Sequence, residues 1–128
     1  MISKVNEQDL EILKKSIIKG MLDKKASNIT SIDLRKGNNS LADLFIVCHG
    51  TSNRQVEAIA ENVEEEVFKT TGEKVKHKEG YTNKEWILLD YFDIIVHVFS
   101  EEKREFFALE KLWGDGEIEV HASENIII

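Results

Sequence analysis

Proline is absent from this chain of 128 residues, and only seven residues are glycine. Turns must therefore be built mainly from Asn, Asp and the few glycines, and the sequence contains no Pro- or Gly-rich linker. Cysteine occurs once, at Cys48, which excludes an intrachain disulfide and favours a reducing compartment. Cys48 lies inside the apolar run at residues 44–48, so we expect a buried structural thiol.

Long hydrophobic runs are also missing, and positive charge is scarce. No stretch approaches the ~20 apolar residues of a membrane span, and the first seven residues do not resemble a signal peptide. The sequence therefore predicts a cytoplasmic protein. With 24 acidic and 17 basic residues the net charge is -7. Because this charge repels phosphate backbones and anionic membranes, we expect no membrane partner and little or no direct nucleic-acid binding.

What is present is enough apolar sequence, 41% of the residues, for one self-folding domain. Hydrophobic periodicity predicts a helix over residues 7–24, a long helix between Ser52 and Gly72, and a final helix over 101–113. Strands are expected at 29–35, 44–48 and 73–79, and two more within 85–99. The tail either adds an edge strand or stays mobile, which the sequence leaves open. This order predicts an α/β fold, a single mixed sheet of about five strands covered by helices.

The stretch from residue 85 to 99 is the most informative one, because two strand-like runs meet there around an acidic and aromatic turn. Alternation places Trp86, Leu88 and Asp90 on one side of the first strand, with Ile87 and Leu89 on the other. A large aromatic beside a carboxylate is typical of an interface anchor. A tryptophan buried in the core remains the alternative for Trp86.

A second candidate is the turn Gly50-Thr51-Ser52, which opens the long helix. Free amides and the helix dipole can hold an anion there, whereas the plain alternative is a capped helix in which Ser52 and Gln55 form a capping box. The arrangement resembles nucleotidyltransferases, but their two metal-binding carboxylates on the next strand are missing, since residues 75–78 read Val-Lys-His-Lys. We therefore expect a nucleotidyltransferase-like topology without that metal site.

No catalytic residue, metal ligand or cofactor site is predicted. Cys48, His49 and His97 form a nucleophile and base only if tertiary contacts bring them together. His97 alternates with Ile95 and Phe99, which favours a hydrogen-bonded core histidine. The remaining histidines lack the spacing of zinc ligands.

Four motifs in order closely resemble the ribosomal silencing factor, or Iojap-like, family. They comprise residues 42–48, 50–60, 86–99 and 109–113, within a match that runs from about residue 10 to 113. We therefore treat residues 1–113 as the family's domain and residues 114–128 as a C-terminal extension of uncertain structure.

This resemblance implies a translational repressor without enzymatic activity. Such a factor binds the large ribosomal subunit through large-subunit ribosomal protein number fourteen and sterically blocks joining of the small subunit. The implied partner-binding residues are Trp86, Leu88, Asp90, Tyr91 and Asp93, which we expect to face outward. Ribosomal proteins are basic, so an acidic factor suits this partner.

Two departures from the family stand out, and two alternative functions stay open. Phe92 occupies a position where many members carry glycine, which implies an altered turn and a larger apolar contact. Residues 126–128 are all isoleucine, which suggests a homodimer formed through an edge strand. The alternatives are a nucleotidyltransferase-like nucleotide-binding protein, favoured only by the Gly50 turn, and a homodimeric module with another client.

Overall fold

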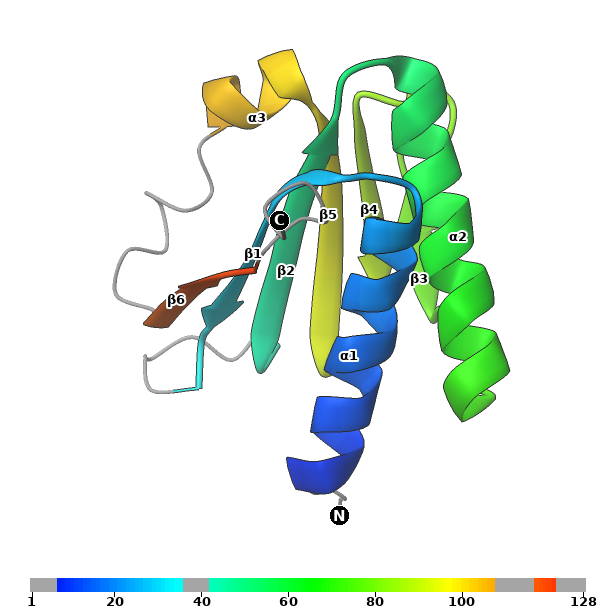
Figure 1. Cartoon of the computed structure of the whole chain (residues 1–128), viewed down its shortest axis with the longest axis vertical. Coiled ribbons are helices and arrows are strands. Elements are labelled where there is room, and N and C mark those ends of the chain that lie inside the picture. Colours follow the sequence, from blue (N-terminus) through cyan, green and yellow to red (C-terminus); the bar gives the residue numbers. More distant parts are fainter. Residues whose placement is uncertain (1–6, 36–41, 108–116, 122–128) are drawn as a thin grey trace, which may run out of the picture.

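The computed structural model describes residues 7–35, 42–107 and 117–121 (Figure 1). Three helices and six strands follow one another along this part of the chain. They are α1 (Glu7–Asp23), β1 (Ser27–Asp33), β2 (Leu44–Gly50), α2 (Asn53–Thr71), β3 (His77–Glu79), β4 (Trp86–Asp90), β5 (Ile94–Ser100), α3 (Glu101–Phe107) and β6 (Glu117–Val120). No helix among the described residues is both long and apolar enough to traverse a bilayer.

The strands form one sheet in the order β3-β4-β5-β2-β1-β6. The central pair, β2 and β5, is parallel, with Leu44 opposite Ile94, while every other described pair is antiparallel. The prediction of a single mixed sheet is therefore confirmed, with six strands instead of about five. The sixth is β6, which pairs with β1, so the tail does supply an edge strand at these four residues.

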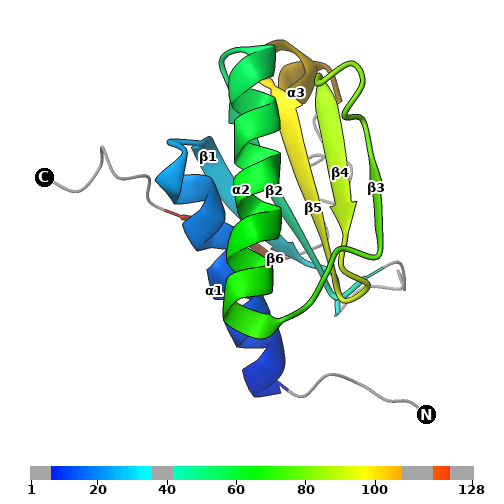
Figure 2. The ribbon, with the colours of Figure 1, turned by 90° about the vertical axis from the view of Figure 1, so that its right-hand side faces the viewer.

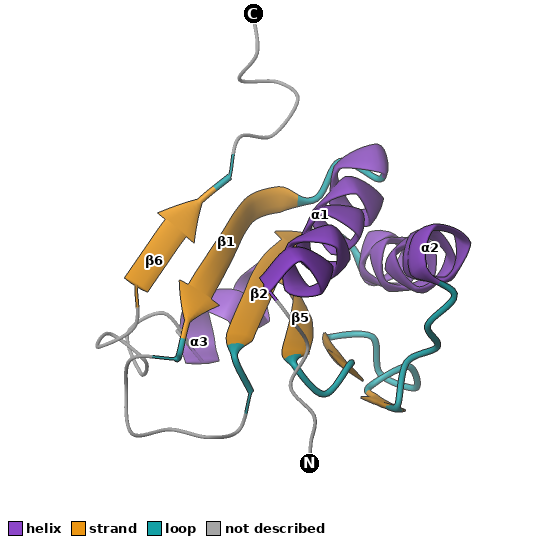
Figure 3. Cartoon of the chain, turned by 90° about the horizontal axis from the view of Figure 1, so that it is seen from below, coloured by secondary structure: helices purple, strands orange, loops and turns teal. Residues whose placement is uncertain are grey.

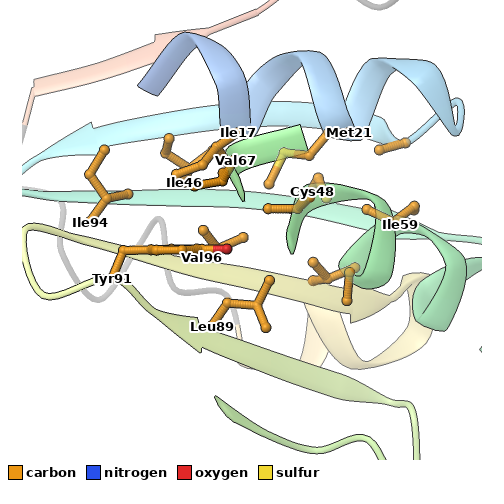
Figure 4. Packing of buried hydrophobic residues seen from close by; sticks show 14 of the residues in the cluster. Ile17, Met21, Ile46, Cys48, Ile59, Val67, Leu89, Tyr91, Ile94 and Val96 are labelled. Atoms are coloured by element: carbon orange, nitrogen blue, oxygen red, sulfur yellow. The ribbon is translucent and has the colours of Figure 1, made fainter. Parts of the chain in front are cut away.

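The two long helices pack side by side on one face of the sheet (Figures 2 and 3). They approach closely because α1 carries Gly20 where it meets Val63 of α2, and Asn62 Nδ2 donates a hydrogen bond of 2.9 Å to the Gly20 carbonyl. Beneath them lies an almost wholly aliphatic core (Figure 4). Its fully buried members include Ile17, Met21, Ile46, Cys48, Ile59, Val67, Leu89 and Val96.

The opposite face of the sheet holds a second, smaller buried cluster. It consists of Ile32, Leu34, Phe45, Val47 and Phe99, with Trp86 and Ile95 packed against it. Of the described helices only the short α3 lies on this side (Figure 3). The long helices thus cover the central strands on one face, and α3 covers the other face only in part.

Most predicted boundaries hold to within two residues, and the caps are those expected. Ser52 Oγ accepts a hydrogen bond from the Gln55 amide, and Gly72 ends α2 in the left-handed conformation with φ 79°. The strand expected at 29–35 begins and ends two residues earlier. The expected third strand, 73–79, shortens to β3. Three predicted features lie outside the described residues: the second half of the final helix, the turn after the first strand and the terminal isoleucines, at residues 108–113, 37–40 and 126–128.

Candidate functional site

The candidate site is the outward side of the β4–β5 hairpin, at the sheet edge that also carries β3 (Figure 2). Trp86, Leu88 and Asp90 share the face opposite α1 and α2, and each is half-buried, whereas Ile87 and Leu89 are fully buried under the helices. The alternation predicted for this strand is confirmed. We call Trp86, Leu88, Asp90 and the half-buried Asp93 of the turn the hairpin surface.

Trp86 is fixed by contacts on β5 while part of its side chain stays accessible. Its ring stacks on that of Phe99, with centroids 4.9 Å apart and an interplanar angle of 26°. Its indole Nε1 donates a hydrogen bond of 3.1 Å to His97 Nδ1. A large aromatic held in one orientation loses little conformational entropy when a partner covers it, which suits an anchor.

His97 supports Trp86 from below and is neutral. Burial lowers the pKa of His97 to about 4. Because an indole N–H can only donate, Nδ1 must accept, and the ring hydrogen of neutral His97 therefore sits on Nε2. Nε2 is buried and has no hydrogen-bond partner among the described residues. The prediction of a buried, hydrogen-bonded histidine is thus confirmed for one of its two nitrogens.

Tyr91 does not belong to this outward surface, and the expectation that it stands outward is wrong. Its side chain is 1% exposed and packs into the aliphatic core under the helices (Figure 4). Burial, followed by the negative charges of Glu64 and Glu73, raises the pKa of the Tyr91 hydroxyl. Alternation continued past Asp90 places Tyr91 with Ile87 and Leu89 on the side covered by the helices, so the period-two rule itself predicts its burial. The outward expectation came from the family resemblance alone.

The turn instead exposes Phe92, which was expected to alter the turn and enlarge the apolar contact but was not among the implied partner-binding residues. Its side chain is 72% exposed, and its backbone is left-handed, with φ 78°. Only three residues, 91–93, separate β4 from β5. The Asp93 amide donates a hydrogen bond of 2.9 Å to the Tyr91 carbonyl, which closes a three-residue γ-turn around Phe92. The glycine that many family members carry at this position was the signal that could have identified it.

Two acidic residues lie close to Phe92 in the sequence. Asp90 precedes the turn and Asp93 is its last residue. Opposite Asp90 on β3 lies His77, whose Nε2 is 2.7 Å from the Glu79 carboxylate. The tip of the hairpin therefore combines an apolar ring with two acidic neighbours. This combination favours contact with a basic surface that also offers an apolar recess.

In the turn before α2, a side chain of the protein itself already bonds the Thr51 amide, which argues against an anion site there. Gln55 Oε1 accepts hydrogen bonds from the Thr51 amide at 2.7 Å and from Thr51 Oγ1 at 3.2 Å, and Gln55 Nε2 donates to the carbonyls of Lys24 and Lys25. The Gln55 side chain thus occupies the position that a phosphate would need. The predicted capping box is only half formed, because Gln55 bonds Thr51 and the α1–β1 turn instead of the Ser52 amide.

The three residues weighed as nucleophile and base do not converge. Cys48 points into the core under the helices, where burial raises the pKa of its thiol to about 12. His97 lies on the other face of the sheet, and His49 Nδ1 is 3.2 Å from Arg104 Nη1. A thiol with that pKa stays protonated at neutral pH and is a poor nucleophile. Among the described residues, no three His, Cys, Asp or Glu side chains form a group suited to a metal ion.

Comparison with known proteins points in one direction. A family described as "Ribosomal silencing factor during starvation" matches residues 7–126, so the match reaches into the segment set apart as an extension. The ribosomal silencing factor of Halalkalibacterium halodurans is 43% identical over 93 residues, which cover 73% of this chain and 78% of that protein. A mouse protein named "Mitochondrial assembly of ribosomal large subunit protein 1" is 29% identical over 73 residues, covering 56% of this chain and 32% of that protein.

The fold has a solved counterpart as well. A crystal structure of a protein from Chromobacterium violaceum superposes with a TM-score of 0.76 at 33% sequence identity, covering 88% of this chain and 92% of that one. The similarity therefore extends over the sheet and both long helices and is not confined to isolated motifs.

Proposed function

Because the chain belongs to the ribosomal silencing factor family, whose names describe a ribosome-associated regulator of translation, we propose how it acts. It binds the large ribosomal subunit through large-subunit ribosomal protein number fourteen, and its bulk then blocks joining of the small subunit. It needs no cofactor for this role. The hairpin surface makes the contact.

The observation that carries the proposal is the unequal burial of β4. Ile87 and Leu89 are fully buried, whereas Trp86, Leu88 and Asp90 stay half-buried on the side that α1 and α2 do not cover. An ordered, partly accessible tryptophan is the kind of residue that anchors the centre of an interface, and a carboxylate beside it suits the polar rim. Tyr91 contributes from behind, by holding the turn against the core.

Charge supports a basic protein as the partner. The net charge is -7, and the hairpin surface includes Asp90 and Asp93. Complementary charge speeds and orients docking, while the phosphates of surrounding ribosomal RNA repel an acidic protein that approaches elsewhere. Replacing Asp90 by Asn keeps an acceptor for the Phe92 amide and removes the charge. We expect this variant to associate more slowly and with a weaker dependence on salt.

Co-sedimentation with purified large subunits tests the proposal directly. Wild type should pellet with the subunits, and Leu88→Ala and Trp86→Ala should pellet at least about ten-fold more weakly, since hot-spot truncations cost about 2 kcal/mol or more. Ile12→Ala is the matched control, because Ile12 is an exposed aliphatic residue on α1, on the far side of the sheet. Folded variants that pellet like wild type would remove these residues from the contact.

Steric blocking needs a second measurement, since binding alone does not establish it. Light scattering of mixed subunits should show that wild type prevents joining and that Leu88→Ala does so only at higher concentration. Purified ribosomal protein number fourteen, added in excess, should compete and restore joining. Tight binding of a nucleotide by the free chain would instead favour the nucleotidyltransferase-like alternative, which the closed Gln55 turn disfavours.

A further inference from the structure

Phe92 combines two unfavourable features that nothing within the described part of the chain offsets. The described residues include four non-glycine positions with positive φ, namely Lys25, Asn28, Lys84 and Phe92, and Phe92 is the apolar one. It is also 72% exposed, the most exposed of the large apolar side chains described. An L-residue in this backbone region is less favourable than glycine, and an exposed phenyl ring gains nothing from burial.

The turn that presents Phe92 is fixed by hydrogen bonds at each of its residues and by the buried Tyr91 side chain. Asp90 Oδ1 accepts a hydrogen bond of 2.7 Å from the Phe92 amide, and the Tyr91 amide donates to the Ile94 carbonyl at 2.9 Å. The Asp93 carbonyl accepts from the amides of Asp43 at 2.9 Å and Leu44 at 3.1 Å. The buried Tyr91 ring fixes the turn to the core. The Phe92 ring is therefore displayed from a rigid support, which lowers the entropic cost of binding.

We propose that Phe92 is the apical anchor of the hairpin surface and enters an apolar recess with a basic rim on the large-subunit ribosomal protein. The apolar recess follows from the exposed ring, and the basic rim follows from the half-buried Asp90, whose carboxylate lies at the Phe92 amide. Base stacking against RNA is disfavoured, because the Asp90 carboxylate and the net charge of -7 would meet phosphates. This inference rests on the proposed function and adds a residue and a chemical description of the partner's pocket to it.

Phe92→Gly separates an anchor from a structural residue. A structural role predicts that the variant unfolds more easily. The anchor predicts an unfolding midpoint equal to or above that of wild type, because glycine suits φ 78°, together with binding to purified large subunits weakened about ten-fold or more. Phe92→Asn, which also tolerates this backbone region, should bind as weakly, and Phe92→Tyr should keep most of the affinity. If Phe92→Gly fails to fold, the same two measurements are made on Phe92→Asn.

The control is Ile12→Ala on α1, since Ile12 is another exposed apolar residue, 42% accessible, on the helix-covered side of the sheet. It should bind like wild type. Folded Phe92 variants that bind normally, while wild type binds, would overturn the anchor and leave the proposed function standing. Absence of wild-type binding would instead overturn the proposed function. An equal loss of affinity for naked large-subunit RNA would also overturn the proposal, by making the occupant a nucleic acid.

Discussion

The two faces of the sheet differ in the side chains that build them and in how completely they are covered. Under α1 and α2 the strands contribute Ile, Val, Leu and one Cys, nearly all without exposed area. On the other face aromatic and histidine rings interlock around Trp86, with Phe45 and His97 in edge contact at 4.7 Å. Aliphatic chains fill space and stabilise, whereas ordered rings that stay partly accessible can also bind. The comparison predicts that stability and binding can be changed separately.

The largest expected difference lies between two neighbouring leucines of β4. Leu89→Ala, on the helix-covered face, should lower the free energy of unfolding by about 3 kcal/mol, because it leaves a cavity in a close-packed core. Leu88→Ala, on the half-open face, should cost less than about 1 kcal/mol. Urea unfolding followed by circular dichroism measures both. Equal losses would mean that the two faces are equally packed.

The contact between α1 and α2 should be nearly as sensitive. A Cβ added at Gly20 would lie 2.8 Å from Val63 Cα, a backbone atom that moves only if the helix moves. Gly20→Ala should therefore destabilise the chain by roughly 1–3 kcal/mol, even though alanine favours helices. Lys15→Ala, at an exposed position of the same helix, is the control and should change little. A more stable Gly20→Ala variant would contradict this tight approach.

On the aromatic face, burial of His97 should make the free energy of unfolding depend on pH. The pKa of His97 falls from 6.5 to about 4 on folding, so below pH 6.5 the unfolded chain binds the proton that the folded chain refuses. Stability due to this group is therefore complete above pH 6.5 and declines as pH falls toward 4, by about 2 kcal/mol between pH 7 and pH 5. His97→Asn should unfold at similar urea concentrations at both pH values. A variant with the same pH slope as wild type would assign the effect to another group.

The smallest effect is expected at the cap of α2. Ser52→Ala removes the acceptor for the Gln55 amide and should cost about 1 kcal/mol without changing ribosome binding. Ser52→Asp retains an acceptor and should recover most of that loss. Thermal unfolding resolves the pair, and co-sedimentation checks that binding is unchanged. A binding defect in a folded Ser52→Ala variant would contradict the prediction that stability and binding can be changed separately.

Local periodicity accounts for what the sequence predicted correctly. The stripes of α1 and α2, the two-sided apolar character of β2 and the alternation of β4 each depend on spacing within one element. Trp86, Leu88 and Asp90 were placed on one face by that rule alone. The caps at Ser52 and Gly72 were equally local.

What the sequence did not predict depends on contacts between distant segments or on a single backbone angle. The exposure of Phe92 depends on its positive φ, whereas the burial of Tyr91 follows from alternation with Ile87 and Leu89 and was missed because the family resemblance was followed instead. Gln55 leaves its expected capping partner because the α1–β1 turn brings the carbonyls of Lys24 and Lys25 within reach. The indole acceptor on His97 appears only once β4 and β5 are paired in register.

The parallel pairing of β2 with β5 has a consequence for how the protein is made. Until β5 has been synthesised, β2 pairs with β1 on one side only, and its other edge, apolar from Leu44 to Cys48, is left unpaired. Such an edge invites pairing with other chains, and non-local strand pairs form late. A product truncated before residue 94 should therefore aggregate, so synthesis of this factor passes through a vulnerable stage that ends when the second half of the chain inserts its central strand.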